Sequence, residues 1–283
     1  MIHPVRIAHR GASGAGLAPE NTLTAFERAI EIGVDAVELD VRSTRDGSLV
    51  VLHDPLLDRT TDREGPVHEL TLAQVREADA GGWFGRAFAG EKVPTLAEAL
   101  DLLRRRALAV IEIKADHLAE AVLRVVDDLV VADQVVIQSF SSETVRRVKA
   151  IDGAAPTALL VGNLPTSPSR MRARRMVREV LSLGANILNI WHTTLTPAFY
   201  EEVRKRGLTV WAWTVDEEVV LRDVVQMGVQ GIATNHPDRL NGVLEELARE
   251  GAILVPLGRS KRLRPGRWRR RREIRRASRR RDS

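Results

Sequence analysis

The sequence predicts a (β/α)8 TIM barrel with a small insertion after its second strand. Short runs rich in β-branched residues alternate with amphipathic helical stretches along most of the chain, and glycine stands where several helices should end. Strands that alternate with helices indicate parallel pairing. An open doubly wound sheet is the alternative, but eight such units in about 250 residues fit a closed parallel barrel better.

Eight segments are predicted as strands because they are short, apolar and rich in valine, isoleucine and threonine. They are Val5–His9, Ala36–Val41, Ala109–Lys114, Gln134–Ser139, Thr157–Val161, Ile187–Ile190, Thr209–Trp213 and Gly231–Thr234. Apolar residues at helical spacing predict the helices Asn21–Ile32, His117–Val130, Ser142–Ala150, Arg172–Leu183, Thr196–Lys205, Glu217–Met227 and Arg239–Glu250. Four helices are followed by a glycine suited to the left-handed terminal position, namely Gly33, Gly184, Gly207 and Gly228.

The segment from about residue 54 to residue 94 interrupts this alternation. It is rich in turn-forming residues, carries an aromatic and glycine cluster around Trp83, and contains one helix-like stretch, Leu72–Ala78. The loops that follow barrel strands build the active site. We therefore expect an insertion on the active-site side of the barrel.

Composition excludes several classes of protein. Hydrophobic residues make up 44% of the chain, which is enough for a substantial core. No run of about 20 apolar residues occurs, so no membrane span is expected. The chain has no cysteine, which excludes disulfides and thiolate metal ligands. Since the first residues lack the pattern of a secretory signal, we expect a cytoplasmic protein, with peripheral attachment to a membrane left open.

The basic charge of the chain belongs to its last residues. Residues 259–283 hold 14 Lys/Arg and two acidic residues, so the preceding 258 residues carry a net charge of −7 although the whole chain carries +5. We expect one domain over residues 1–258 and a basic, disordered tail over residues 259–283. Two further roles for the tail are left open: attachment to an anionic membrane surface and, as the less favoured reading, binding of nucleic acid.

Acidic side chains cluster at the carboxyl ends of the predicted strands. Glu38 and Asp40 share one face of a strand, as do Glu112 and Lys114 of another, because residues two apart on a strand point the same way. These ends meet at one mouth of a barrel, where three carboxylates would repel each other unless a cation lay between them. A hard divalent cation, Mg²⁺ or Ca²⁺, is suited to such oxygen ligands. Pairing of the acids with barrel arginines or lysines is the alternative.

Four histidines fall at or just beyond the predicted strand ends. His9 lies at the end of the first strand, and His53 lies in an extended run next to the strand of Glu38. Histidine titrates near neutral pH, so two of them beside a metal suit acid–base catalysis. We expect His9 and His53 to be this pair, and we assign structural roles to His192 and His236.

Two basic residues accompany these groups. The planar guanidinium of Arg10 suits phosphoryl oxygens, and Lys114 adds a second positive charge. One metal ion, one arginine and one lysine could balance the charge of a phosphodiester and leave two histidines free to move protons. A salt bridge at the bottom of the barrel is the alternative for Arg10.

Several motifs closely resemble those of the glycerophosphodiester phosphodiesterases. HRGASGAGLAPENTLTAF (His9–Phe26) is similar to the HRG…PENT signature of that family. Further blocks continue the resemblance over about residues 4–250: ELDVRSTRDGSLVVLHD (Glu38–Asp54), IEIK (Ile111–Lys114), QSF (Gln138–Phe140), WTVD (Trp213–Asp216) and ATNHPD (Ala233–Asp238). The blocks are specific in combination, whereas any one alone is weak.

The resemblance implies a barrel of the phospholipase C-like phosphodiesterase type. It implies hydrolysis of sn-glycero-3-phospho-alcohols to glycerol 3-phosphate and an alcohol, with one divalent metal ion. The implied roles are metal ligation by Glu38, Asp40 and Glu112, acid–base catalysis by His9 and His53, phosphate contact by Arg10 and Lys114, and pocket walls formed by Phe140 and Trp213. The alternative substrate is a lysophospholipid, cleaved at a membrane reached through the basic tail. A different class of function is a nucleic-acid-associated protein that uses the tail.

Two positions depart from the pattern of the family that the chain resembles. Asn235 stands where many relatives have an acidic residue, and Asp216 stands where they have asparagine. We expect both side chains at the rim of the site or behind it, where they would affect substrate preference more than chemistry.

Overall fold

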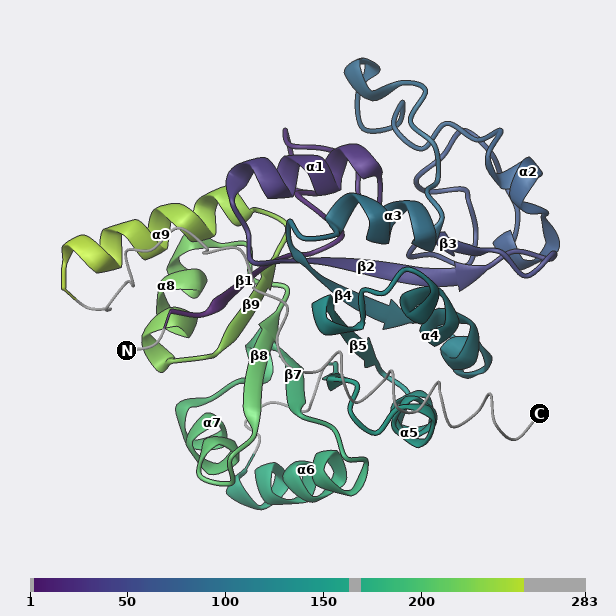
Figure 1. Cartoon of the computed structure of the whole chain (residues 1–283). Coiled ribbons are helices and arrows are strands. Elements are labelled where there is room, and N and C mark those ends of the chain that lie inside the picture. The colour runs from purple at the N-terminus through teal and green to yellow at the C-terminus, as the bar shows by residue number, and fades with distance from the viewer. Residues whose placement is uncertain (1–2, 163–168, 252–283) are drawn as a thin grey trace.

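The computed structural model describes residues 3–162 and 169–251 and contains one sheet with helices packed around it (Figure 1). Its strands are β1 (Val5–Ala8), β2 (Ala36–Ser43), β3 (Leu49–Val51), β4 (Leu108–Ile113), β5 (Val135–Ser139), β6 (Thr157–Val161), β7 (Ile187–Trp191), β8 (Thr209–Trp213) and β9 (Gly231–Thr234). Its helices are α1 (Leu23–Ile32), α2 (Leu72–Val75), α3 (Leu96–Leu103), α4 (Ala119–Asp128), α5 (Ser142–Ile151), α6 (Arg170–Ser182), α7 (Pro197–Arg204), α8 (Glu218–Met227) and α9 (Pro237–Arg249).

The eight parallel strands close into a barrel. Their order around the sheet is β1-β9-β8-β7-β6-β5-β4-β2, and β1 also pairs with β2 through Ile7 opposite Ala36. β3 lies outside the closed ring and pairs antiparallel with the end of β2. The predicted (β/α)8 barrel is therefore confirmed, and the open sheet is excluded.

The inside of the barrel has an apolar layer and, beyond it, a polar one. The apolar layer consists of Ile7, Ala36, Val110, Val136, Ala158, Ile187, Trp211 and Ala233. Two residues further along four of these strands, and therefore on the same inner face, stand Glu38, Glu112, Gln138 and Asn189. The apolar layer fills the barrel below, so these polar groups face its carboxyl-terminal mouth.

One helix of the barrel, α3, was not predicted from the sequence, and the helix-like stretch predicted in the insertion is shorter than expected. The stretch Leu72–Ala78 forms only the short α2, whereas α3 buries Leu96 and Leu100 against the barrel. The signal for α3 was present, because Thr95 and Glu98 form a capping box at its start. The turn-rich segment just before it concealed this signal. The other predicted helices occur within a few residues of their expected ends.

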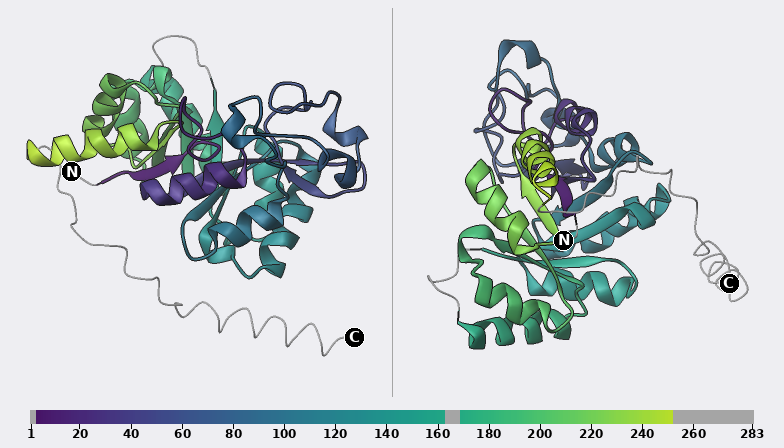
Figure 2. Two further views of the ribbon diagram at one scale, coloured as in Figure 1. Left: turned by 90° about the horizontal axis from the view of Figure 1, so that it is seen from above. Right: turned by 90° about the vertical axis from the view of Figure 1, so that its left-hand side faces the viewer.

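β3 and the residues between it and α3 form a lobe with its own small core. Its apolar cluster comprises Val50, Leu52, Leu57, Val67, Val75, Ala80 and Val93. The lobe projects on the side of the molecule opposite α6 and α7 (Figures 1 and 2). The arrow of β2 points toward it, so it stands on the side of the strand carboxyl ends.

The predicted basic tail, residues 259–283, lies outside the described residues. Within residues 3–162 and 169–251, none of the helices is both long and apolar enough to cross a membrane.

Candidate active site

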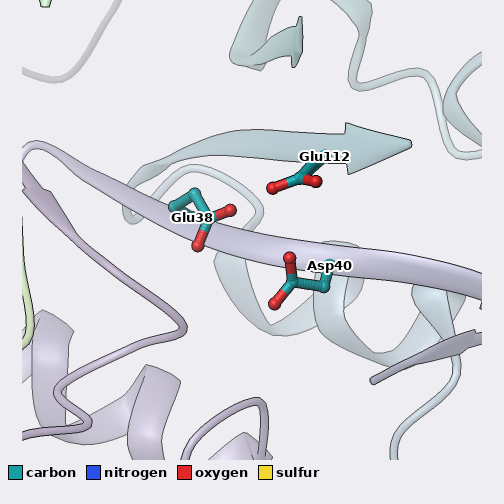
Figure 3. Close-up of side chains that lie close together, drawn as sticks. All are labelled: Glu38, Asp40 and Glu112. Atoms are coloured by element: carbon teal, nitrogen blue, oxygen red, sulfur yellow. The ribbon is translucent and has the colours of Figure 1, made fainter. Parts of the chain in front are cut away.

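Three carboxylates lie together at the carboxyl ends of β2 and β4 (Figure 3). Asp40 and Glu112 are direct neighbours in the parallel register, and Glu38 lies two residues before Asp40 on the same face. Their side chains offer oxygens that all lie within 4.8 Å of one another, and all three residues are buried. This convergence agrees with the prediction from strand positions in the sequence.

The basic side chains around this cluster do not fully balance the charge of its three carboxyl groups. Lys114 Nζ lies 2.8 Å from Asp40 Oδ1 and 2.6 Å from Glu112 Oε1. Burial raises the pKa of Glu38, and the charges of Asp40 and Glu112 raise it further. Burial and the charge of Asp40 also raise the pKa of Glu112, to about 7. Two carboxyl groups that resist ionisation are the expected result when acids are buried together without enough positive charge.

The pKa of Asp40 is shifted in the opposite direction from the pKa values of Glu38 and Glu112. Burial opposes its ionisation, but Lys114 and Arg10 outweigh burial and hold the pKa of Asp40 below its usual range. Its Oδ1 forms the ion pair with Lys114 yet accepts no hydrogen bond of good geometry. A buried, ionised oxygen with an incomplete set of partners, next to two further carboxylates, fits a hard divalent cation.

Arg10 is held against the cluster by an unusual backbone conformation. Its φ is +57°, and its backbone N–H donates to Glu38 Oε2 at 3.0 Å. Its guanidinium lies 2.9 Å from Glu20 and 3.3 Å from Asp40. Arg10 therefore belongs to the mouth of the barrel, and a salt bridge at the barrel bottom is excluded.

Asn21 supports the cluster from the loop that precedes α1. Its φ is +58°, and its Nδ2 donates to Asp40 Oδ2 at 2.8 Å. The predicted helical segment Asn21–Ile32 starts two residues too early, since the helix begins at Leu23 with Thr22 as its N-cap. The contact with Asp40 was not predicted.

His9 is fixed by residues from two other loops. Its Nδ1 lies 2.7 Å from Asn235 Oδ1, and Asn235 in turn donates to Asp216. Burial and the charge of Arg10 lower the pKa of His9 to about 4. Asn235 and Asp216 were expected at the rim of the site or behind it, where they would affect substrate preference more than chemistry. Asp216 does lie behind Asn235, but Asn235 contacts His9 directly.

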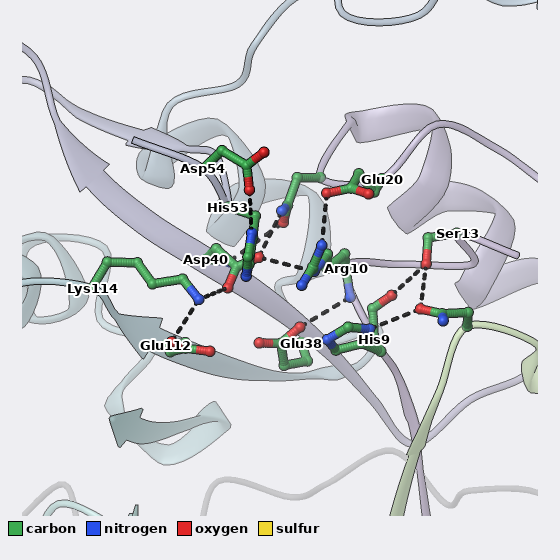
Figure 4. Close-up of polar contacts among 12 residues, drawn as sticks. His9, Arg10, Ser13, Glu20, Glu38, Asp40, His53, Asp54, Glu112 and Lys114 are labelled. Atoms are coloured by element: carbon green, nitrogen blue, oxygen red, sulfur yellow. Dashed lines mark hydrogen bonds and ion pairs between the residues drawn. The ribbon is translucent and has the colours of Figure 1, made fainter. Parts of the chain in front are cut away.

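His53 faces the cluster from the start of the inserted lobe (Figure 4). Its Nδ1 lies 2.5 Å from Asp54 Oδ1, and Arg59 binds Asp54 and Glu20 at 2.6 and 2.7 Å. Burial lowers the pKa of His53, an effect that the charge of Asp40 partly offsets. Glu20 and Arg59 were not predicted, because neither stands at a strand end.

Aromatic side chains line the mouth on the side of β5, β7 and β8. Trp213 contacts Phe140 and Trp191 edge to face, with ring centroids 5.3 and 4.8 Å apart. Phe140 is 49% exposed. Phe140 and Trp213 were predicted at this wall, and Trp191 was not.

A polar chain crosses the barrel between the carboxylates and the aromatic wall. Gln138 donates to Glu38 at 3.1 Å, and Asn189 donates to Gln138 at 2.9 Å. The indole N–H of Trp213 donates to the carbonyl oxygen of Asn189 at 3.3 Å. The wall is thereby tied to the floor of the carboxylate cluster.

The other two histidines predicted near strand ends, His192 and His236, stand apart from this network. The ring of His192 stacks on Trp191, with centroids 5.4 Å apart. The ring of His236 packs against Gly14, where an added Cβ would lie 2.3 Å from it. Within the described parts of the chain, neither ring forms a hydrogen bond or ion pair with the three carboxylates.

Comparison with known proteins gives one consistent family. The model of the glycerophosphoryl diester phosphodiesterase family matches residues 9–239. A glycerophosphodiester phosphodiesterase of Caldanaerobacter subterraneus subsp. tengcongensis is 36% identical over 240 residues, which cover 83% of this chain and 95% of that protein.

Solved structures agree with the sequence matches. The glycerophosphodiester phosphodiesterase of Agrobacterium tumefaciens is 32% identical with a TM-score of 0.73, covering 85% of this chain and all of the other. A phosphodiesterase of Oleispira antarctica, in complex with the product sn-glycerol-3-phosphate, is 27% identical with a TM-score of 0.77, covering 86% of this chain and 97% of the other.

Proposed function

The chain belongs to the glycerophosphoryl diester phosphodiesterase family, and we propose that it hydrolyses glycerophosphodiesters to sn-glycerol 3-phosphate and an alcohol with one bound divalent cation. The observation that carries the proposal is the convergence of three carboxylates, two basic side chains and two histidines at one barrel mouth, formed by Glu38, Asp40, Glu112, Arg10, Lys114, His9 and His53. The product bound to the Oleispira antarctica relative supports the same substrate class.

The carboxylates of Glu38, Asp40 and Glu112 would hold the cation. When bound, it would stabilise negative charge on the phosphate and make a nearby hydroxyl more acidic. Arg10 and Lys114 now neutralise Asp40 at 3.3 and 2.8 Å. A cation that took over this role would free both side chains to bind phosphoryl oxygens.

The two histidines would move the protons. One imidazole takes the proton of the glycerol 2-hydroxyl as this oxygen forms a bond to phosphorus. The other imidazole protonates the alcohol oxygen as its bond to phosphorus breaks. Water then opens the cyclic phosphate while the two histidines exchange roles, so that both return to their starting states. Phe140 and Trp213 would line the pocket beside the reacting groups.

The test is a hydrolysis screen on chelated protein to which Mg²⁺ or Ca²⁺ is returned. We expect release of glycerol 3-phosphate from glycerophosphocholine, glycerophosphoethanolamine or glycerophosphoglycerol with one of the ions and not in chelator. Glu38→Ala and Asp40→Ala should be inactive, whereas Glu245→Gln on the exposed face of α9 should match the wild type. Hydrolysis that is unaffected by chelation and by both alanine variants would contradict the metal assignment.

The same screen tests the lipid-directed alternative. A lysophospholipid presented in vesicles is added as a further substrate. We expect the small glycerophosphodiesters to be cleaved with the higher kcat/KM. A clear preference for the lysophospholipid would favour the alternative function.

A further inference from the structure

The amide of Asn235 is held at both of its ends. Its Nδ2 donates to Asp216 Oδ2 at 2.7 Å, and its backbone N–H donates to Asp216 Oδ1 at 2.8 Å. A carboxylate only accepts hydrogen bonds, so the NH2 end of Asn235 must face Asp216. The amide oxygen must then face His9, whose Nδ1 lies 2.7 Å away.

The surrounding loops keep this arrangement in place. Thr234 donates its hydroxyl to Asp216 at 3.0 Å. The hydroxyl of Ser13 lies 2.9 Å from Asn235 Oδ1 and 2.7 Å from the carbonyl oxygen of His9. The backbone N–H of Gly14 donates to the carbonyl oxygen of Asn235 at 2.7 Å. These residues end or follow β1, β8 and β9, which are neighbours in the barrel.

The orientation of the amide determines the state of the imidazole. An amide oxygen can only accept, so His9 Nδ1 must carry hydrogen, and Nε2 of the neutral ring must carry the lone pair. Nε2 has no hydrogen-bond partner among residues 3–162 and 169–251. We propose that Asp216 and Asn235 form a positioning clamp that fixes the tautomer of His9, so that Nε2 is the atom that exchanges the proton. The inference rests on the proposed role of His9 in proton transfer.

The clamp also differs in charge from a carboxylate placed directly on the ring. The charged groups near His9 are Arg10, Asp40 and Glu20, and its direct partner Asn235 is neutral. An aspartate in direct contact would fix the ring and stabilise its protonated form as well. The hydrogen bond to the neutral Asn235 raises the pKa of His9 less than burial lowers it, while Asp216 orients the amide through two hydrogen bonds.

The first measurement reads the tautomer directly. Long-range ¹H–¹⁵N correlation spectra of the chelated wild-type protein at pH 8 should assign hydrogen to Nδ1 and the lone pair to Nε2 of His9. A ring protonated at Nε2 in this state would overturn the proposal.

The second measurement is the activity of a variant in which the amide of Asn235 is free to turn around. In Asp216→Asn the amide of Asn235 can turn its NH2 group toward His9, which favours the wrong tautomer. We expect kcat to fall on the order of 100-fold with a small change in KM. This is less than the roughly 10⁴-fold loss when the triad aspartate of a serine protease becomes asparagine, because the productive amide orientation here remains accessible.

In the double variant Asp216→Asn/Asn235→Asp, the carboxylate at position 235 again accepts the hydrogen bond from His9 Nδ1. The amide at position 216 can donate a hydrogen bond to that carboxylate from behind. We expect kcat to recover to within about tenfold of the wild type, and the acid limb of the kcat/KM profile to move to higher pH because a carboxylate now contacts the ring. A purely structural role predicts neither the recovery nor the pH shift. A double variant no better than Asp216→Asn would overturn the proposal. If Asp216→Asn does not fold, Asn235→Ala replaces it as the impaired variant.

Controls separate this inference from the proposed function. Asp223→Asn, an exposed acid on α8, should match the wild type. His9→Ala that keeps full activity would show that the proposed role of His9 is wrong. An inactive His9→Ala together with a fully active Asp216→Asn would show that His9 acts without the clamp.

Discussion

Replacing Glu112 by glutamine should stabilise the metal-free protein at alkaline pH. Glu112 is 7% exposed, and burial together with the charge of Asp40 raises its pKa to about 7. Glutamine keeps the shape of the side chain and removes the charge. Lys114 keeps Asp40 as a partner at 2.8 Å, so the substitution leaves no unpaired ammonium group.

The sign and size of the stabilisation expected for Glu112→Gln follow from the linkage between proton binding and folding. A carboxyl group whose pKa is higher in the folded state than in the unfolded state destabilises the fold as the pH rises from the unfolded value to the folded value. With values of about 4.5 and about 7, the cost in free energy of unfolding is about 1 kcal/mol at pH 5 and about 3 kcal/mol at pH 8. In proteins of this size about 1 kcal/mol changes Tm by roughly 2–4 °C.

The assay is thermal unfolding in chelator at pH 5 and pH 8. Glu112→Gln should unfold roughly 6–12 °C above the wild type at pH 8 and only a few degrees above it at pH 5. Returning Mg²⁺ or Ca²⁺ should raise the Tm of the wild type at pH 8 and leave the variant nearly unchanged, because a ligand is missing. Glu245→Gln serves as the control for loss of an acid. A variant equal to or less stable than the wild type at pH 8 in chelator would refute the reasoning.

Three further predictions concern activity. His9→Ala and His53→Ala should each lower turnover by about two to four orders of magnitude, the usual range for a proton-transfer group, whereas His192→Ala should lower it much less; equal losses in all three variants would contradict the choice of pair. Phe140→Ala should raise KM by about tenfold and change kcat little, because a wall contacts ground and transition states alike; steady-state kinetics on glycerophosphocholine would check this. Truncation after Pro256 should leave these kinetics unchanged, and loss of activity would mean that the tail takes part in the site.

The barrel and its carboxylates could be predicted because both depend on local patterns. Strand–helix alternation implies parallel strands, and parallel strands bring their carboxyl ends to one mouth. Glu38, Asp40 and Glu112 then follow from their places on two strands, since residues two apart share a face. The register that sets Asp40 opposite Glu112 confirms this reasoning.

The partners of the histidines could not be predicted in the same way. Asn235 lies 226 residues from His9, and Arg59 lies 39 residues from Glu20. These contacts depend on how loops of irregular conformation fold back over the mouth. The periodicity of apolar residues in the sequence does not indicate the conformation of such loops. The motif blocks did mark the regions, because Asp216 and Asn235 both fall inside blocks that resemble the family. They gave no indication that the two side chains touch.

The loop before α1 explains how fold and site come to depend on the same residues. Thr22 caps the helix through the backbone N–H of Ala25, while Asn21 binds Asp40 and Glu20 binds Arg10 and Arg59. Three consecutive side chains can point to a helix, a carboxylate and an inserted lobe only because the backbone turns sharply between them. The positive φ of Asn21 provides that turn, and asparagine tolerates it better than most residues. A residue at position 21 must therefore satisfy the backbone and also reach Asp40, which restricts this position more than burial alone would.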